Sequence, residues 1–266
     1  MIITTGDIID AIESRARPEW QEDYDNTGWQ ILVSDKRTTP CHGVMLCIDV
    51  TPEIVVEAYE KECNLIIAHH PLFFRSIRQL DGGNRVGASA LAAIRRNISI
   101  YSCHTSIDKA PCGVSYYLAQ RMGLKNIDIL SFSDNKSIGI GVIGDVDPSK
   151  SFGVILSEIK NICHSPVARC SGIPTEDRKI GRVAIGAGAC ADLIPVAVAK
   201  GAEIMITSDV KHNYFIDFNP NIAVVDLGHF ETEECTKDIF YKIITEKFPN
   251  FVPCYSEKER NPIIYL

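Results

Sequence analysis

The sequence predicts an α/β protein with largely parallel sheets. Strand-like and helix-like segments alternate along almost all of the 266 residues, a pattern typical of strands joined by crossover helices. Several strand-like segments are continuous apolar runs, as expected of strands that are covered on both faces of a sheet. Hydrophobic residues make up 45% of the chain and charged residues 23%, so the composition is that of a globular protein with a substantial core.

The predicted elements follow one another closely. The segment 43–50 predicts a strand, and 51–63 predicts a helix that Thr51 caps and in which Pro52 occupies the first turn. The C-terminal stretch 251–266 predicts a terminal edge strand. The other predicted elements are strands over 64–70, 98–104, 138–146, 181–189, 202–209 and 221–229, and helices over 87–97, 112–123, 149–161 and 230–248.

We expect these elements to form two domains. The composition becomes more polar at about 126–137, and 170–180 reads as a loop. The first domain is therefore expected to comprise 1–125 plus 221–266 and to carry most of the polar residues considered below. The second domain is expected to comprise 126–220.

Charge and cysteine usage narrow the classes of partner. The net charge is −7 and no basic run stands out, which argues against general nucleic-acid binding and against an anionic membrane surface. We find no signal-peptide pattern and no apolar run near the roughly 20 residues that span a bilayer. The ten cysteines are scattered without a CxxC pair, so reduced thiols in a cytoplasmic protein are expected.

Polar side chains gather where four predicted strands end. Open α/β sheets bind their ligands at the carboxyl ends of the strands, and five of the seven histidines lie at such positions. If a helix begins near Phe230, its Glu233 can face the same side as the histidine before it. The residues at the four ends are His69 and His70, His104 and Asp108, Asp209 and His212, and His229 and Glu233.

Imidazoles and carboxylates in this number predict a metal site. Neutral imidazoles and carboxylates suit Zn, Fe or Mn, whereas the cysteines are not spaced as ligands. Carboxylates can bridge two cations, and a pair of divalent ions activates water as a nucleophile at neutral pH. The sequence therefore favours a centre of two divalent metal ions.

Each pattern also has a structural interpretation when it is taken alone. The His69-His70 doublet could be a structural pair, and Asp108 could cap the following helix. The spacing of His229 and Glu233 also suits a simple i,i+4 contact on a helix. Asp209 and His212 could be surface residues or could support a ligand. The metal interpretation rests on the four strand ends occurring together.

The same stretches resemble the GTP cyclohydrolase 1 type 2 homologue family, also called the Ngg-interacting-factor-like family. The resemblance begins in "RPEWQEDYDNTGWQ" (17–30) and continues through "IIAHHPLFF", "CHTSID" and "TSDVKH" to "GHFETEE". It covers nearly the whole chain. The order and spacing of these stretches make it more specific than any one of them.

The resemblance implies two three-layer α/β domains, a dinuclear metal site in the cleft between them and a homohexamer. The family's metal ligands fall on His69, His70, Asp108, His229 and Glu233. His104 and His212 fall on positions near the site that are not ligands. His104 is therefore our candidate catalytic residue, because it could donate a proton.

Three functions follow as hypotheses. The first is a metal-dependent hydrolase that uses metal-activated water on a nucleotide or another phosphorylated small molecule, like a GTP cyclohydrolase by resemblance. The second is a non-catalytic protein that binds metal or a partner in a regulatory role. The third is a redox di-iron protein. The sequence shows no GxSxG elbow and no Gly-rich phosphate loop, which argues against a serine hydrolase and a P-loop enzyme.

Overall fold

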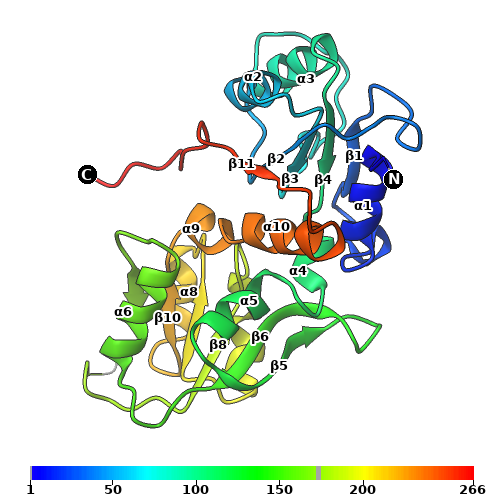
Figure 1. The fold of residues 1–266 in the computed structure, drawn as a ribbon. Coiled ribbons are helices and arrows are strands. Elements are labelled where there is room, and N and C mark those ends of the chain that lie inside the picture. The colour runs from blue at the N-terminus through cyan, green and yellow to red at the C-terminus, as the bar shows by residue number, and fades with distance from the viewer. Residues whose placement is uncertain (1, 172–174) are drawn as a thin grey trace. The chain divides into compact units, whose positions relative to one another are not determined.

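The chain divides into two compact units (Figure 1). The computed structural model describes residues 2–171 and 175–266. The first unit comprises the residues up to Ala110 together with Thr236–Arg260, and the second comprises Pro111–Cys235 together with Asn261–Leu266. Each unit contains its own sheet and helices, so the predicted α/β class is confirmed.

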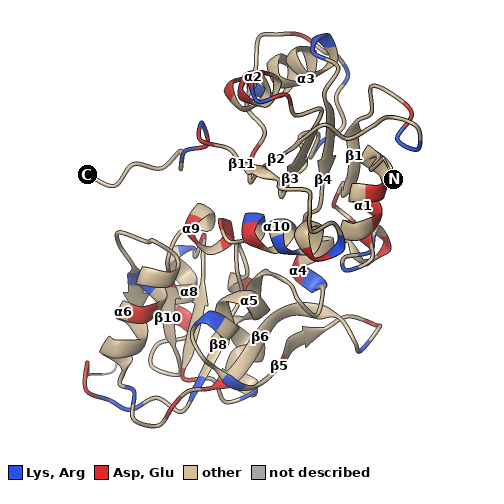
Figure 2. Cartoon of the chain, in the orientation of Figure 1, with Lys and Arg blue, Asp and Glu red and all other residues tan. Residues whose placement is uncertain are grey.

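The sheet of the first unit is mostly parallel. Its strand order is β1-β4-β3-β2-β11, and only the pair β1–β4 is antiparallel. None of its strands contains Lys, Arg, Asp or Glu, so the charged residues of this unit lie on its helices and loops (Figure 2). The strands are β1 (Gly28–Ile31), β2 (Val44–Cys47), β3 (Leu65–Ala68), β4 (Ser99–Ser102) and β11 (Cys254–Tyr255).

Helices of the first unit start where side chains satisfy their free N–H groups. Thr4 and Asp7 form a capping box, the Thr51 hydroxyl accepts from the Ile54 N–H, and the Asn84 side chain accepts from the Gly87 N–H. α2 packs beside α3, and α1 beside α10. These elements are α1 (Thr5–Glu13), the 3-10 turn η1 (Pro18–Trp20), α2 (Pro52–Glu60), α3 (Arg85–Arg95), α4 (Thr105–Lys109) and α10 (Thr236–Lys247).

The sheet of the second unit is mixed, which differs from the prediction of largely parallel sheets. Its order is β5-β6-β8-β9-β10-β7, with parallel pairing at β8–β9 and β9–β10 and antiparallel pairing elsewhere. The segment that forms β5 is polar in sequence because, as an edge strand, it buries little of its length. The strands are β5 (Lys125–Phe132), β6 (Gly139–Asp145), β7 (Arg169–Ser171), β8 (Arg182–Ile185), β9 (Ile204–Thr207) and β10 (Ala223–Asp226).

Helices also cover the sheet of the second unit. α5 contacts β6 and β8, and α7 contacts β5. Residues of α7 share one apolar core with Ala184, Met205 and Val224 of the sheet. The elements are α5 (Val114–Arg121), α6 (Phe152–Ile162), η2 (Ala191–Leu193), α7 (Ile194–Ala199), α8 (His212–Asp217) and α9 (His229–Glu233). None of the helices in the described ranges is long and apolar enough to cross a bilayer.

The boundaries of the two units differ from the expected domain boundaries. β10 and α5 were expected in the first domain but fall in the second unit. β10 pairs with β9, with Val224 opposite Met205, and α5 contacts β6 and β8. The single helix expected over 230–248 is two helices, α9 and α10, and the change of unit falls between Cys235 and Thr236. These assignments depend on strand pairing, which local composition does not reveal.

The buried carboxylate of Glu57 on α2 binds the C-terminal segment. Glu57 is 3% exposed and accepts hydrogen bonds from the Ser256 hydroxyl at 2.6 Å and from the backbone N–H of Glu257 at 2.8 Å. Burial raises the pKa of Glu57, but hydrogen bonds from Ser256, Glu257 and Lys61 outweigh it and lower the pKa to about 2. The folded state therefore favours the charged carboxylate.

We expect Glu57→Gln to lower the free energy of unfolding at pH 7 by about 2 kcal/mol, because it weakens several charge-assisted hydrogen bonds. The folded-state pKa of about 2 lies below the ordinary value of 4.5, so this stabilisation is present above pH 4.5 and is lost as the pH falls towards 2. Urea denaturation at a series of pH values measures the effect. Glu60→Gln, on the exposed face of the same helix, should change stability by less than about 0.5 kcal/mol. A Glu57 variant as stable as wild type at pH 7 would contradict this account.

Candidate metal centre

His69 is oriented by a backbone carbonyl. It follows β3, its side chain is fully buried, and its Nδ1 lies 3.2 Å from the carbonyl oxygen of Cys103. A carbonyl only accepts hydrogen bonds, so Nδ1 carries the proton in the neutral ring and Nε2 keeps its lone pair. The backbone N–H of His69 donates to the carbonyl of Cys47 at 3.1 Å, which holds the residue in register with the end of β2.

His70 is oriented by a carboxylate from the neighbouring strand end. Its Nδ1 lies 3.2 Å from Oδ1 of Asp49, which follows β2. Burial raises the pKa of Asp49, but the hydrogen bond and charge of His70 outweigh it and lower that pKa. The backbone N–H of His70 donates to the carbonyl of Ile48 at 2.9 Å. Side chain and backbone of His70 are thus both held by the two residues that follow β2.

His104 is oriented by a buried carboxylate from the N-terminal part of the chain. Its Nδ1 lies 2.8 Å from Oδ1 of Asp25, whose side chain is fully buried. Oδ2 of Asp25 accepts from the backbone N–H of Thr105 at 3.0 Å and from its hydroxyl. Burial raises the pKa of Asp25, but the hydrogen bonds from His104 and Thr105 outweigh it and hold the pKa well below its usual range.

These three imidazoles form one cluster in the first unit. Ligand nitrogens of His69, His70 and His104 all lie within 4.8 Å of one another. Oδ1 of Asp108, on α4, lies 4.0 Å from Nε2 of His69, and the side chain is 17% exposed. Asp108 does not cap the following helix, since the N-cap of α5 is Gly113. Three imidazole nitrogens and one carboxylate at one strand edge form a donor set that Zn, Fe and Mn accept.

A second donor set lies in the second unit. His229 is the first residue of α9, its Nδ1 lies 2.7 Å from Oδ2 of Asp209, and its Nε2 lies 2.9 Å from Oε2 of Glu233. Glu233 is buried, with 4% of its side chain exposed. The i,i+4 contact considered for His229 and Glu233 is therefore present, and Asp209 is a partner of His229 rather than an isolated surface residue.

Glycine at position 188 makes room for Glu233. Gly188 has a φ of +67°, and a Cβ placed there would lie 2.0 Å from Oε1 of Glu233. Its N–H donates to the hydroxyl of Thr232 at 3.0 Å, which ties the turn after β8 to α9. Any larger residue at position 188 would displace the carboxylate of Glu233.

One arrangement is common to the four histidines. Each has Nδ1 directed at an oxygen that accepts a hydrogen bond, and Nε2 of His229 also lies 2.9 Å from Oε2 of Glu233. Metal-binding imidazoles are held in this way by carboxylates and carbonyls. The donor chemistry of both sets therefore fits divalent metal ions. The four acceptors are the Cys103 carbonyl, Asp49, Asp25 and Asp209.

Sequence reasoning identified the candidate ligands and missed most of their partners. It assigned no role to Asp25 or Asp49, and it left Asp209 undecided. Asp49 follows a predicted strand directly, so the same strand-end argument could have found it, whereas Asp25 lies outside any such end. His212 is exposed at the first residue of α8 and belongs to no candidate metal-ligating group among the described residues.

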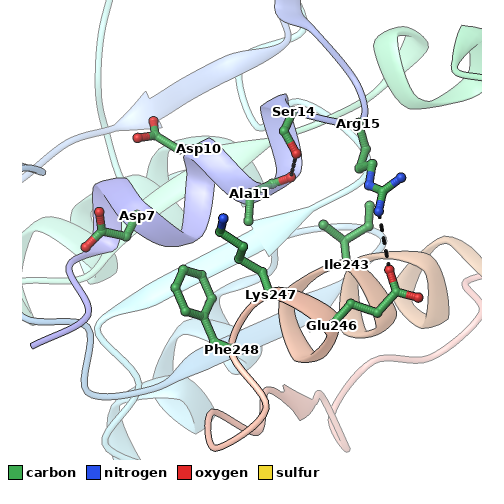
Figure 3. A pocket seen from close by; sticks show the side chains of 9 residues that line it. All are labelled: Asp7, Asp10, Ala11, Ser14, Arg15, Ile243, Glu246, Lys247 and Phe248. Atoms are coloured by element: carbon green, nitrogen blue, oxygen red, sulfur yellow. Dashed lines mark hydrogen bonds and ion pairs between the residues drawn. The ribbon is translucent and has the colours of Figure 1, made fainter. Parts of the chain in front are cut away.

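A separate hollow of about 620 Å³ lies against α1 and α10 of the first unit (Figure 3). It is lined by Asp7, Asp10, Ala11, Ser14, Arg15, Ile243, Glu246, Lys247 and Phe248. Its charges are largely paired within the protein, since Arg37 lies 2.5 Å from Asp10, and Arg15 lies 3.5 Å from Glu246. None of the predicted ligands lines it, and we assign it no ligand.

The chain belongs to the Duf34/NIF3 (NGG1p interacting factor 3) family, whose model matches residues 3–262. It is similar to the GTP cyclohydrolase 1 type 2 homolog of Clostridium acetobutylicum, with 31% identity over 237 residues that cover 88% of this chain and 86% of that protein. The GTP cyclohydrolase 1 type 2 homolog of Nostoc sp. is 35% identical over 234 residues, covering 85% and 86%. The predicted family membership is confirmed.

Solved structures agree with the fold. A hypothetical protein of Staphylococcus aureus superimposes with a TM-score of 0.88 at 25% identity, covering 100% of both chains. A Bacillus cereus protein related to NIF3 superimposes with a TM-score of 0.90 at 22% identity, also covering 100% of both chains.

We expect Gly188→Ala to weaken metal binding by at least about 10-fold, because the new Cβ displaces Glu233. Equilibrium dialysis against Zn²⁺ followed by elemental analysis measures bound metal per chain. Gly201→Ala is the matched control: Gly201 also has a positive φ, of +76°, but a Cβ there meets no atom within 4 Å. Equal metal binding by the two variants would show that Gly188 does not act through Glu233.

Proposed function

We propose that this protein is a metal-dependent hydrolase that uses metal-activated water to act on a nucleotide or another phosphorylated small molecule. The observation that carries the proposal is the cluster of His69, His70 and His104, whose ligand nitrogens lie within 4.8 Å of one another and whose Nδ1 atoms each face a carbonyl or carboxylate oxygen. The names of the relatives, GTP cyclohydrolase 1 type 2 homolog, support a nucleotide as the substrate class.

Five residues would hold two divalent ions in this proposal, with Zn, Fe and Mn as the candidates. When bound, such ions supply Lewis acidity and lower the pKa of water. Five protein ligands are too few to saturate two ions, so water and substrate would have room to bind. The ligands are His69, His70, Asp108, His229 and Glu233.

His104 would transfer protons rather than bind metal. Asp25 keeps the proton on Nδ1 and, as a buried carboxylate, stabilises the imidazolium that forms when Nε2 takes up a proton. Nε2 is then the atom that gains or gives up a proton during the reaction. The side chain is 15% exposed, which allows exchange with solvent.

A cysteine nucleophile does not fit the same site. Cys103 is the cysteine adjacent to His104, but it is fully buried and its Sγ lies 3.3 Å from the hydroxyl of Ser106. Burial raises the pKa of Cys103 to about 12, so the thiol stays protonated at neutral pH. This favours attack by water over a covalent intermediate.

The function is tested by a screen of nucleotides and phosphoesters on purified protein, with and without chelator. We expect activity to disappear on chelation, to return with Mn²⁺ or Zn²⁺, and to survive thiol alkylation and Cys103→Ser. Activity that tolerates chelation and is lost on alkylation would reject the proposal. Tight metal binding without turnover of any substrate would favour a regulatory role.

The ligand assignment predicts that Asp108→Ala and Glu233→Ala each lower the metal bound per chain well below the wild-type value, because each removes a carboxylate that balances the cation charge. Elemental analysis after dialysis gives the stoichiometry. Glu234→Ala, next to Glu233, is the control and should bind like wild type. Unchanged stoichiometry in both test variants would refute the assignment.

The role of His104 predicts that His104→Asn keeps the metals but lowers the hydrolytic rate about 10²-fold or more, the usual effect of losing a general acid or base. Metal content and turnover are measured on the same preparation. If the variant loses metal instead, His104 is a ligand.

A further inference from the structure

A buried carboxylate of the C-terminal segment binds the end of β2. Oε1 of Glu259 accepts hydrogen bonds from the backbone N–H of Ile48 at 2.5 Å and of Asp49 at 3.3 Å. Oε2 lies 2.6 Å from Nζ of Lys237 on α10. The side chain of Glu259 is 5% exposed and that of Lys237 is 10% exposed, so all three contacts are shielded from water.

The peptide that Glu259 binds also holds His70. The carbonyl of Ile48 accepts from the N–H of His70 at 2.9 Å, and the carboxylate of Asp49 lies 3.2 Å from Nδ1 of the same residue. A continuous chain of contacts therefore runs from Lys237 through Glu259 to the main chain at Ile48 and Asp49, and from there to His70. All of these residues belong to the first unit.

The geometry of this chain is suited to fixing a position. The two residues after β2 have left the strand, and without Glu259 their N–H groups would need another acceptor. A carboxylate that accepts from two successive N–H groups fixes that turn of the main chain more firmly than a neutral acceptor does. Lys237 fixes the carboxylate in turn, and removing either charge would leave the other buried without its partner.

We propose that Glu259 is a positioning residue of the metal centre, which sets the place of His70 through the main chain and side chain of Asp49. The inference rests on the proposed metal centre, because it assigns His70 as a ligand. It adds a residue from the C-terminal segment that touches neither metal nor substrate. Outer partners of metal ligands change metal affinity by about 10–100-fold when they are lost.

The test is a titration of the metal-free full chain with Co²⁺, followed by visible absorption, which reports the affinity and the coordination geometry of the ion. We expect Glu259→Ala to weaken Co²⁺ binding about 10–100-fold and to change the absorption spectrum. Glu257→Ala is the matched control from the same segment. Its side chain is 80% exposed, and we expect wild-type affinity and spectrum.

A double-mutant cycle with Asp49→Ala tests the route. If Glu259 acts through Asp49, the losses of Co²⁺ affinity caused by the two substitutions overlap. The double variant then binds Co²⁺ no more than about 3-fold more weakly than the single variant with the lower affinity. Losses that multiply would overturn the inference, as would wild-type affinity and spectrum in folded Glu259→Ala. If Glu259→Ala does not fold, Glu259→Asp decides: it keeps the charge, shortens the reach by one methylene and should still weaken binding. Wild-type Co²⁺ binding by Glu259→Asp would then overturn it.

The wild-type titration separates this inference from the proposed function. A wild-type chain that does not bind Co²⁺ refutes the metal centre and the inference with it. A wild-type chain that binds Co²⁺ while the Glu259 variants bind equally well refutes only the positioning role.

Discussion

The hydrogen bond at Nδ1 of each site histidine is the constraint on which the rest of the site depends. An imidazole can bind a cation through either nitrogen, and the hydrogen bond at one nitrogen decides which of the two faces the cation. Here a carbonyl or carboxylate oxygen faces Nδ1 in all four cases, as is usual for imidazoles that bind metal. The carboxylates also place negative charge beside rings that would bind a cation.

The strand ends of the first sheet supply two of these four oxygens, from Asp49 and from the carbonyl of Cys103. β2, β3 and β4 are parallel neighbours, so the residues that follow them lie along one edge of the sheet. Asp49, His70 and His104 come from those three ends. The apolar strands below them carry no charge, so the polar groups concentrate at the edge where the hydrogen-bonding ladder stops. Burial at this edge makes each unsatisfied polar group costly, which favours full pairing.

Family membership and the chemistry of the site answer different questions. Folds host many functions, so the family match and the TM-scores establish the architecture, and the function has to be argued from the donor groups. Among the described residues the candidate donor groups are imidazoles and carboxylates without cysteine, and such donors suit hard or borderline divalent cations better than soft ones.

The sequence alone determined what depends on short spans of chain. The α/β class, the strands after residues 43, 64 and 98, the Thr51 cap and the candidate ligands at strand ends all follow from local pattern. The tertiary structure alone decided which residues meet across long separations. Asp25 and His104 are 79 residues apart, and Ile48 and Glu259 are 211 apart. The placement of β10 in the second sheet and the need for glycine at position 188 are of the same kind. Such contacts arise only when strands pair and helices pack, and no local propensity encodes them.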